Sequence, residues 1–236
     1  MEYLTPESLT LCLRRGGTLL QGRIVAVQSE PFHATNAANF LVSLTYSDAA
    51  PPDMPKRLFV KRCDQWGEFA DAEVGWYTFI APLCPYLKPV PCYGYEIDAG
   101  AESYTLLLAD LTETHNHNFG VTPTFERYVP IVEQFAALHA GWWNHAELGT
   151  FTGQLPTAEV VERALEMARD GKERMIENFE LTPEQRDIIN HVFATHPQRL
   201  IERGRDTQTL TCVHGDPNPS NLLSPNDGLG NSYIIE

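Results

Sequence analysis

Three polar residues near the end of the chain, His214, Asp216 and Asn221, have types and spacing that could support chemistry on a hydroxyl group. They follow the pattern H-x-D-x-x-x-x-N. In loops with this pattern the aspartate accepts a proton from an attacking hydroxyl, and the asparagine binds magnesium. Pro217 and Pro219 fix φ between the two side chains, which lowers the entropy lost in holding both in place. The pattern therefore predicts a loop that brings a base and a metal ligand to one cleft.

The same loop has a second interpretation, in which Asp216, Asn218 and Ser220 are ordinary turn residues of a hairpin. A pair of residues earlier in the chain weighs against it. Lys61 ends the run Leu-Phe-Val-Lys, and Glu73 follows twelve positions later in a stretch with helical periodicity. A site that transfers a phosphoryl group from ATP also needs a lysine that binds the α- and β-phosphates. In such sites the lysine lies on a strand and is held by a glutamate from a packed helix. Each residue alone is more often a solvated surface group, so we give weight to their order along the chain.

On these residues the sequence resembles the aminoglycoside phosphotransferase and choline kinase family of small-molecule kinases, whose fold is similar to that of protein kinases. The loop has this family's H-G-D form, whereas protein kinases have arginine at the position of Gly215. The resemblance covers about residues 20 to 236. Besides the loop it rests on four segments: Phe59–Lys61, Glu73–Tyr77, Leu106–Leu111 and Phe135–Trp143.

The resemblance implies a role for each matching residue. Asp216 would be the catalytic base, Asn221 a magnesium ligand, Lys61 the contact to the α- and β-phosphates, Glu73 its ion-pair partner, and His214 a residue that orients the loop. Ala109 and Leu111 would lie in the segment that crosses between two lobes and would offer backbone groups to adenine. The implied cofactors are ATP and Mg²⁺.

Two features depart from the family's pattern. The segment Gln28–Asn39, where a phosphate-covering loop should lie, contains no glycine, although its small residues would still let backbone amides approach phosphate. Glu236, the last residue, stands where the family has a magnesium-binding aspartate followed by further helices. A glutamate can bind magnesium, but its extra methylene moves the carboxylate by about one bond length. We expect the chain to be a fragment, because the apolar strands before Glu236 would otherwise lack a covering layer.

Periodicity predicts the elements that must position these residues. Strands are expected at residues 24–27, 40–46, 57–61, 104–108, 210–213, 222–223 and 233–235. Helices are expected at 68–80, from Thr122 as N-cap and Pro123 to near 141, and from a Thr182–Gln185 capping box through 193. We therefore predict an α+β, protein-kinase-like fold. An N-terminal lobe of antiparallel strands with one helix (1–108) would precede a mostly helical C-terminal lobe (109–236), incomplete at its end, with ATP between them.

Composition and charge narrow the class of partner. The 17 Lys and Arg residues against 31 Asp and Glu residues give a formal net charge of −14. This balance opposes binding to nucleic acid or to anionic membranes and favours a cationic or metal-bound small ligand, unless it serves solubility alone. Five cysteines without a C-x-x-C pair, and no signal-peptide pattern, indicate reduced thiols and a cytoplasmic location. The oligomeric state is left open.

Two further polar patterns have ordinary interpretations. The run His115-Asn116-His117-Asn118 resembles a nuclease motif or a metal-binding pair, but no cysteine pair accompanies it, and we expect a polar loop. An acidic helical stripe is expected to be a solvated face, with the rim of a cationic-substrate site as the alternative. The stripe consists of Glu162, Glu166, Asp170, Glu173 and Glu177.

The sequence thus predicts transfer of the γ-phosphoryl group of ATP to a hydroxyl on a small molecule, such as an aminoglycoside, a choline-like compound or another alcohol. The alternative is a nucleotide-binding pseudokinase, a regulatory module without turnover. Both departures from the family's pattern favour that alternative. The sequence does not select the phosphate acceptor.

Overall fold

The computed structural model describes residues 2–33, 37–64, 70–98, 100, 102–150 and 155–235, without the side chains of residues 2 and 70–72. The chain forms two compact units, Met1–Gly141 with Val213–Glu236, and Trp142–Cys212. Every predicted site residue belongs to the first unit, but Glu236 lies outside the described residues. The two predicted lobes, 1–108 and 109–236, are not these two units, because they were defined as the two sides of a nucleotide site. The lobe boundary at residue 108 stays a prediction.

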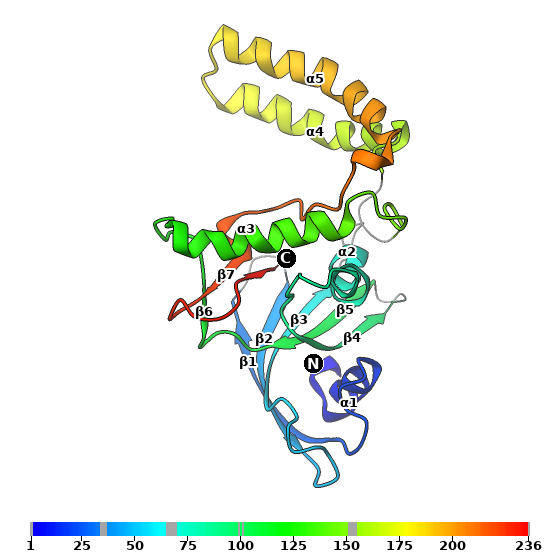
Figure 1. The fold of residues 1–236 in the computed structure, drawn as a ribbon, viewed down its shortest axis with the longest axis vertical. Coiled ribbons are helices and arrows are strands. Elements are labelled where there is room, and N and C mark those ends of the chain that lie inside the picture. The colour runs from blue at the N-terminus through cyan, green and yellow to red at the C-terminus, as the bar shows by residue number, and fades with distance from the viewer. Residues whose placement is uncertain are drawn as a thin grey trace. The chain divides into compact units, whose positions relative to one another are not determined.

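The first unit is built on a five-stranded antiparallel sheet with the strand order β1-β2-β3-β5-β4 (Figure 1). Its strands are β1 (Ile24–Phe32), β2 (Ala38–Tyr46), β3 (Arg57–Asp64), β4 (Cys92–Asp98) and β5 (Ser103–Ala109). The four strands predicted in this region correspond to β1, β2, β3 and β5. The segment 28–39 is mostly strand, because β1 and β2 pair as far as Phe32 and Asn39. The connection expected to cover phosphates is thus reduced to residues 33–37, of which 34–36 lie outside the described residues.

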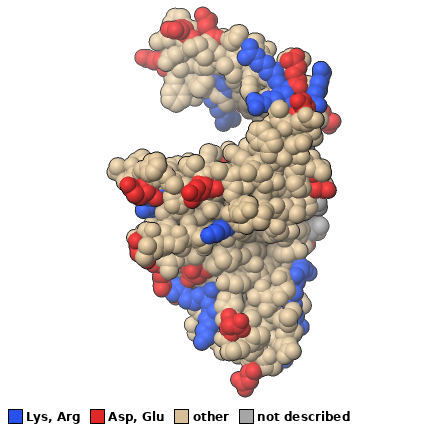
Figure 2. Space-filling model, in the orientation of Figure 1, with Lys and Arg blue, Asp and Glu red and all other residues tan. Residues whose placement is uncertain are grey.

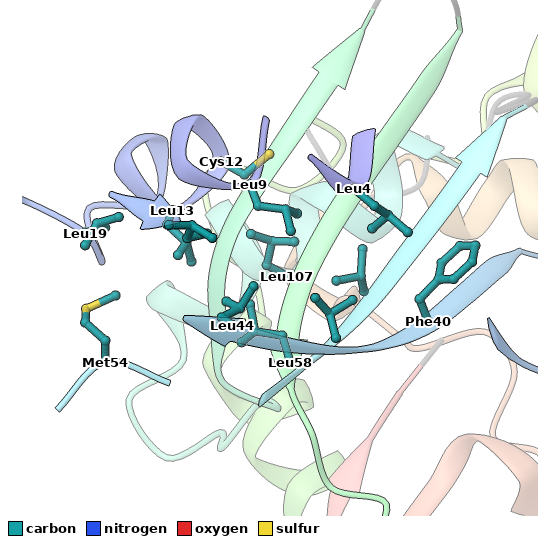
Figure 3. Packing of buried hydrophobic residues seen from close by; sticks show 13 residues of the cluster. Leu4, Leu9, Cys12, Leu13, Leu19, Phe40, Leu44, Met54, Leu58 and Leu107 are labelled. Atoms are coloured by element: carbon teal, nitrogen blue, oxygen red, sulfur yellow. The ribbon is translucent and has the colours of Figure 1, made fainter. Parts of the chain in front are cut away.

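One face of this sheet is covered by helix α1 (Pro6–Arg15), which follows the short helix η1 (Glu2–Leu4) and was not predicted. Thr5 caps α1 by accepting a hydrogen bond from the Ser8 N–H at 3.2 Å, and Pro6 occupies its first turn. Apolar side chains of the helix and the strands interdigitate in a buried core (Figure 3). Its members include Leu4, Leu9, Leu13, Leu44, Leu58 and Leu107. With this face buried under α1, the opposite face of the sheet is left for a site.

The opposite face carries α2 (Ala70–Gly75), the π-helical turn η2 (Trp76–Ile80) and η3 (Ala81–Leu83). They replace the single helix predicted over 68–80, and the helical backbone continues past Ile80 into η3, which includes Pro82. Val74 packs with buried residues of β5 and with Val90. Glu73, one position earlier, is also buried, at 4% exposure. The packing of α2 thus holds a carboxylate against the sheet.

A second, three-stranded sheet has the order β6-β7-β8 and consists of β6 (His115–His117), β7 (Leu222–Pro225) and β8 (Tyr233–Ile234). The two predicted C-terminal strands are confirmed, whereas the polar loop expected at 115–118 contains β6. Helix α3 (Phe125–Trp142) packs on this sheet through Ile131, which contacts Leu222 and Ile234. The helix begins later than predicted, because the Thr124 hydroxyl, not Thr122, accepts from the Arg127 N–H at 3.3 Å.

The strand predicted at 210–213 is wrong, because this segment pairs with no described strand and has no regular structure. The Leu210 carbonyl instead accepts a hydrogen bond from the Asn144 N–H at 2.9 Å. Short helices lie on either side of the segment, η4 (Thr207–Thr209) before it and η5 (Pro219–Asn221) after the loop that contains His214 and Asp216.

The second unit contains two long helices, α4 (Ala158–Asn178) and α5 (Pro183–Gly204). The capping box predicted at Thr182 and Gln185 is confirmed, with both reciprocal hydrogen bonds present. All five residues of the acidic stripe on α4 are exposed, and Glu162 forms an ion pair with Arg169 at 3.0 Å. Figure 2 shows acidic and basic side chains together on the visible face of this unit. These observations agree with a solvated face.

The predicted α+β class, with an antiparallel sheet first and helices dominating the later part, is confirmed. None of the five cysteines, all of which lie within the described ranges, forms a disulfide. Within the described ranges, no helix has both the length and the apolar character that crossing a membrane requires.

Candidate functional site

A cavity of about 670 Å³ lies on the sheet face opposite α1, a volume in the usual range for small-molecule sites. Strands β1, β2, β3 and β5, helix α2, strand β6 and the segment around β7 and β8 all contribute to its wall. Five of the predicted site residues line it: Lys61, Glu73, Ala109, Leu111 and Asn221. Long-range pairing thus brings together residues from distant parts of the chain.

The cavity wall has an apolar part and a polar part. Phe59 and Leu108 are register partners on β3 and β5, and Phe32 packs edge-on against Phe59 with ring centroids 5.3 Å apart. Lys61 lies two residues farther along β3 on the same face, about 7 Å from Phe59 along the strand. The cavity can therefore hold a ligand with a flat apolar group at one end and an anionic group at the other.

The polar part centres on a buried ion pair. Lys61 Nζ lies 2.7 Å from Glu73 Oε1, and the two side chains are 15% and 5% exposed. The Tyr104 hydroxyl, on β5, donates a hydrogen bond to the other carboxylate oxygen, Glu73 Oε2. Burial, together with the Glu73 charge, raises the pKa of Tyr104, so the hydroxyl stays protonated and remains a donor. Glu73 is thereby fixed from two sides.

Tyr104 was not predicted as a site residue. The signal in the sequence is slight, because Tyr104 is one of three hydroxyl-bearing residues, with Ser103 and Thr105, that begin the strand before its apolar run. A buried Tyr hydroxyl normally has a partner, but the partner could be named only once α2 was placed against β5.

We expect Tyr104→Phe to lower the free energy of unfolding by about 1–3 kcal/mol, because it leaves a buried carboxylate oxygen without its donor. Tyr95→Phe on β4 is the matched control, since no hydrogen bond of the Tyr95 hydroxyl occurs within the described part of the chain. Urea denaturation of both variants measures the difference. Equal stability losses in the two variants would show that the Tyr104 hydroxyl does not support Glu73.

The segment after β5 is held rigid by the side chain of Asp110. Its Oδ1 accepts hydrogen bonds from the Thr112 N–H at 3.0 Å and the Thr112 hydroxyl at 2.6 Å. Its Oδ2 lies 2.9 Å from Arg57 Nη2 on β3. These contacts fix the backbone that was predicted to face adenine.

Backbone groups of Ala109 and Leu111 are partly committed within the fold. The Ala109 N–H donates to the Pro91 carbonyl at 2.9 Å, and the Leu111 carbonyl accepts from the N–H groups of Thr114 and His115. The Ala109 carbonyl and the Leu111 N–H take no part in these bonds. Both residues line the cavity, as the predicted backbone contacts to adenine require.

In the loop that precedes β7, Gly215 has φ of +90°, a conformation that residues with a Cβ rarely adopt. The turn interpretation holds for Asn218, whose side chain accepts from the Ser220 N–H and hydroxyl, each at 3.1 Å. Asp216 has a different contact. Asn221 Nδ2 donates to its Oδ2 at 2.9 Å and to its carbonyl oxygen at 3.2 Å. The exposed Asp216 carboxylate is thus held beside the cavity-lining Asn221.

His214 anchors the same loop. Its Nε2 lies 3.2 Å from the carbonyl oxygen of Ile235, and since a carbonyl can only accept, Nε2 carries the proton. The rings of Trp76 and Phe135 pack edge-on against the imidazole, at centroid distances of 6.3 and 6.1 Å. Burial lowers the pKa of His214, which keeps the ring neutral. These contacts fit a positioning role rather than a proton-transfer role.

Mg²⁺ prefers oxygen ligands, and the side chain of Asn221 offers one, its Oδ1. Because Asn221 Nδ2 is directed at Asp216, its Oδ1 is turned away from that carboxylate. The Ser220 hydroxyl donates to this Oδ1 only at 3.5 Å, a long contact that does not need the second lone pair of the oxygen, so Oδ1 can also serve as a ligand. The second predicted ligand, Glu236, lies outside the described residues. Within the described residues no three His, Cys, Asp or Glu side chains are grouped to hold a metal ion.

No protein-family model matches the sequence, and no curated protein matches it. Among solved structures, the chain is similar to the choline kinase LicA from Streptococcus pneumoniae, with 16% sequence identity and a TM-score of 0.44. The match covers 90% of this chain and 63% of that one, so the chain spans less than two thirds of that structure's length.

Proposed function

We propose that the chain is an ATP-dependent, kinase-like phosphotransferase that moves the γ-phosphoryl group of ATP to a hydroxyl of a small molecule. The observation that carries this proposal is the sharing of one cavity by the Lys61–Glu73 ion pair and by Asn221, which is hydrogen-bonded to Asp216. A phosphate-binding cation and a hydroxyl-activating carboxylate at one site are what phosphoryl transfer requires.

Binding of ATP follows from the two parts of the cavity wall. Adenine lies in the apolar part and uses the Ala109 carbonyl and the Leu111 N–H. The Lys61 ammonium, held by Glu73, binds the α- and β-phosphates. Because Lys61 is largely shielded from water, its attraction to phosphate is stronger than that of a surface lysine.

In the reaction, the oxygen of the acceptor hydroxyl attacks the γ-phosphorus. The bond between this phosphorus and the bridging oxygen of the β-phosphate breaks, and ADP leaves. The acceptor's proton passes to the Asp216 carboxylate, which Asn221 holds in place. Asn221 Oδ1, with Glu236 as proposed second ligand, would hold Mg²⁺, which when bound neutralises phosphate charge.

The proposed acceptor is a small hydroxyl compound, and a cationic one such as an amino alcohol or aminoglycoside fits the net charge of −14. Nucleic acid and membrane surfaces are not proposed as partners. A cytoplasmic location, where thiols are reduced and ATP is present, belongs to the same proposal.

The second candidate, a nucleotide-binding module without turnover, is favoured by the glycine-free β1–β2 connection. The two are separated by following ATP, ADP and phosphate esters in the presence of Mg²⁺ and a panel of amino alcohols, aminoglycosides and sugars. A phosphorylated acceptor supports the phosphotransferase. ATP binding without any ester supports the module, and absence of ATP binding contradicts both.

A further inference from the structure

Asn39, near the start of β2, is a polar residue that the site as described leaves without a role. It is the register partner of Lys61, so the two side chains lie on the same face of the sheet, and both line the cavity. Asn39 is 8% exposed. Its Oδ1 is buried and accepts no hydrogen bond from any described residue.

An unmet buried amide oxygen calls for a physical explanation. Buried side-chain oxygens are nearly always hydrogen-bonded, because an unpaired one has lost its water without gaining a partner. Leu41, the next residue of β2 on this face, is apolar. An apolar side chain at position 39 would likewise fill the cavity wall and would leave no buried oxygen without a hydrogen bond. The polar side chain at Asn39 is therefore explained better by a ligand than by the fold of the unliganded protein.

The register indicates which part of a nucleotide Asn39 can reach. Leu108 directly precedes the segment assigned to adenine and lies on β5, two strands away from β2. It is in register with Phe59 and Leu41, two residues along the strands from the register of Lys61 and Asn39. These offsets amount to about 10 Å across the sheet and about 7 Å along it. The adenine edge is out of reach, whereas the phosphates bound by Lys61 are adjacent.

We propose that Asn39 binds the triphosphate of the nucleotide, an inference that rests on the proposed function and extends it. The Asn39 carboxamide rotates so that Nδ2 donates to a non-bridging oxygen of the phosphate group that Lys61 also contacts, while Oδ1 accepts from the Lys61 ammonium. Since no described residue holds either amide atom, this rotation breaks no hydrogen bond. The contact supplies a donor that a glycine-rich β1–β2 connection would otherwise provide through its backbone.

The test is titration calorimetry of wild type, Asn39→Ala and Asn39→Asp with two probes, ATP with Mg²⁺ and adenosine. Asn39→Ala is expected to weaken ATP binding about tenfold and to leave adenosine binding within about twofold. Asn39→Asp, which places a negative charge beside the phosphates, is expected to weaken ATP binding further. Without ligand, Asn39→Ala is expected to melt no lower than wild type, because the unmet oxygen is gone.

Three outcomes would overturn the inference. Wild-type ATP affinity in Asn39→Ala would remove Asn39 from the binding site while leaving the proposed function intact. Equal weakening of ATP and adenosine, together with a lower melting temperature, would make Asn39 a structural residue. A wild-type protein that binds neither probe would contradict the proposed function itself, and the inference with it.

Discussion

The Asp216→Asn protein is expected to bind ATP normally and to transfer the phosphoryl group at least about a hundredfold more slowly than wild type. The substitution removes the proton acceptor for the attacking hydroxyl. It preserves the local structure, because a carboxamide oxygen can still accept the hydrogen bond that Asn221 Nδ2 donates. The side chain is exposed, so little packing is lost.

Asn218→Ala is the matched control for this experiment. Asn218 lies in the same loop, but its side chain accepts hydrogen bonds only from Ser220, as a cap of η5. We expect this variant to lose about 1 kcal/mol of stability and to retain most of its rate. An Asp216→Asn protein that melts normally and turns over at the wild-type rate would reduce Asp216 to a turn residue.

The second large effect is expected for Lys61→Ala, which should lower kcat/KM for ATP by about a hundredfold. The ammonium that binds the α- and β-phosphates is lost. Glu73 becomes a buried carboxylate without its cation, which we expect to lower stability on the order of 3 kcal/mol. Glu73→Ala should change kcat/KM in the same direction but less, because the lysine charge remains. Steady-state kinetics, with unfolding measured in parallel, test both changes.

Loss of stability and loss of function can be separated at this pair. The double variant Lys61→Met with Glu73→Gln removes both charges, and Tyr104 can still donate to the amide oxygen of the introduced glutamine, so stability should largely return. Activity should not return, because no cation meets the phosphates. Wild-type kcat/KM for ATP in Lys61→Ala, or recovery of activity in the double variant, would place the nucleotide elsewhere.

The elements that carry the site could be predicted where the local sequence pattern, such as apolar alternation in a strand, also reflects burial in the folded sheet. Apolar alternation predicted four of the five strands of the large sheet, and the order of a strand lysine and a helix glutamate predicted the ion pair between Lys61 and Glu73. Strand β4 was missed because it contains Gly94 and Glu96 and ends in a second acidic residue, Asp98. The structure explains the glycine, since a Cβ there would overlap the Cys12 carbonyl of α1.

Other features depend on contacts that no local pattern records. Helix α1 has ten residues, too few for stability in isolation, and it is stabilised by packing its apolar side on the sheet. Tyr104 and Asn39 lie in strands that contain other polar residues as well, and their surroundings are set by α2 and by the pairing of β2 with β3. Propensity treats both as ordinary strand positions, so their burial and partners became visible only in the folded chain.

The most direct test of the account is chemical labelling with an acyl-phosphate derivative of ATP, whose acyl group passes to an amine lying against the phosphates. The chain contains four lysines, Lys56, Lys61, Lys88 and Lys172, so three serve as internal controls. Peptide mass spectrometry should find the acyl group mainly on Lys61, and excess ATP should prevent its transfer there. Labelling spread evenly over the four lysines, or labelling of Lys61 that ATP does not reduce, would contradict a nucleotide site in this cavity.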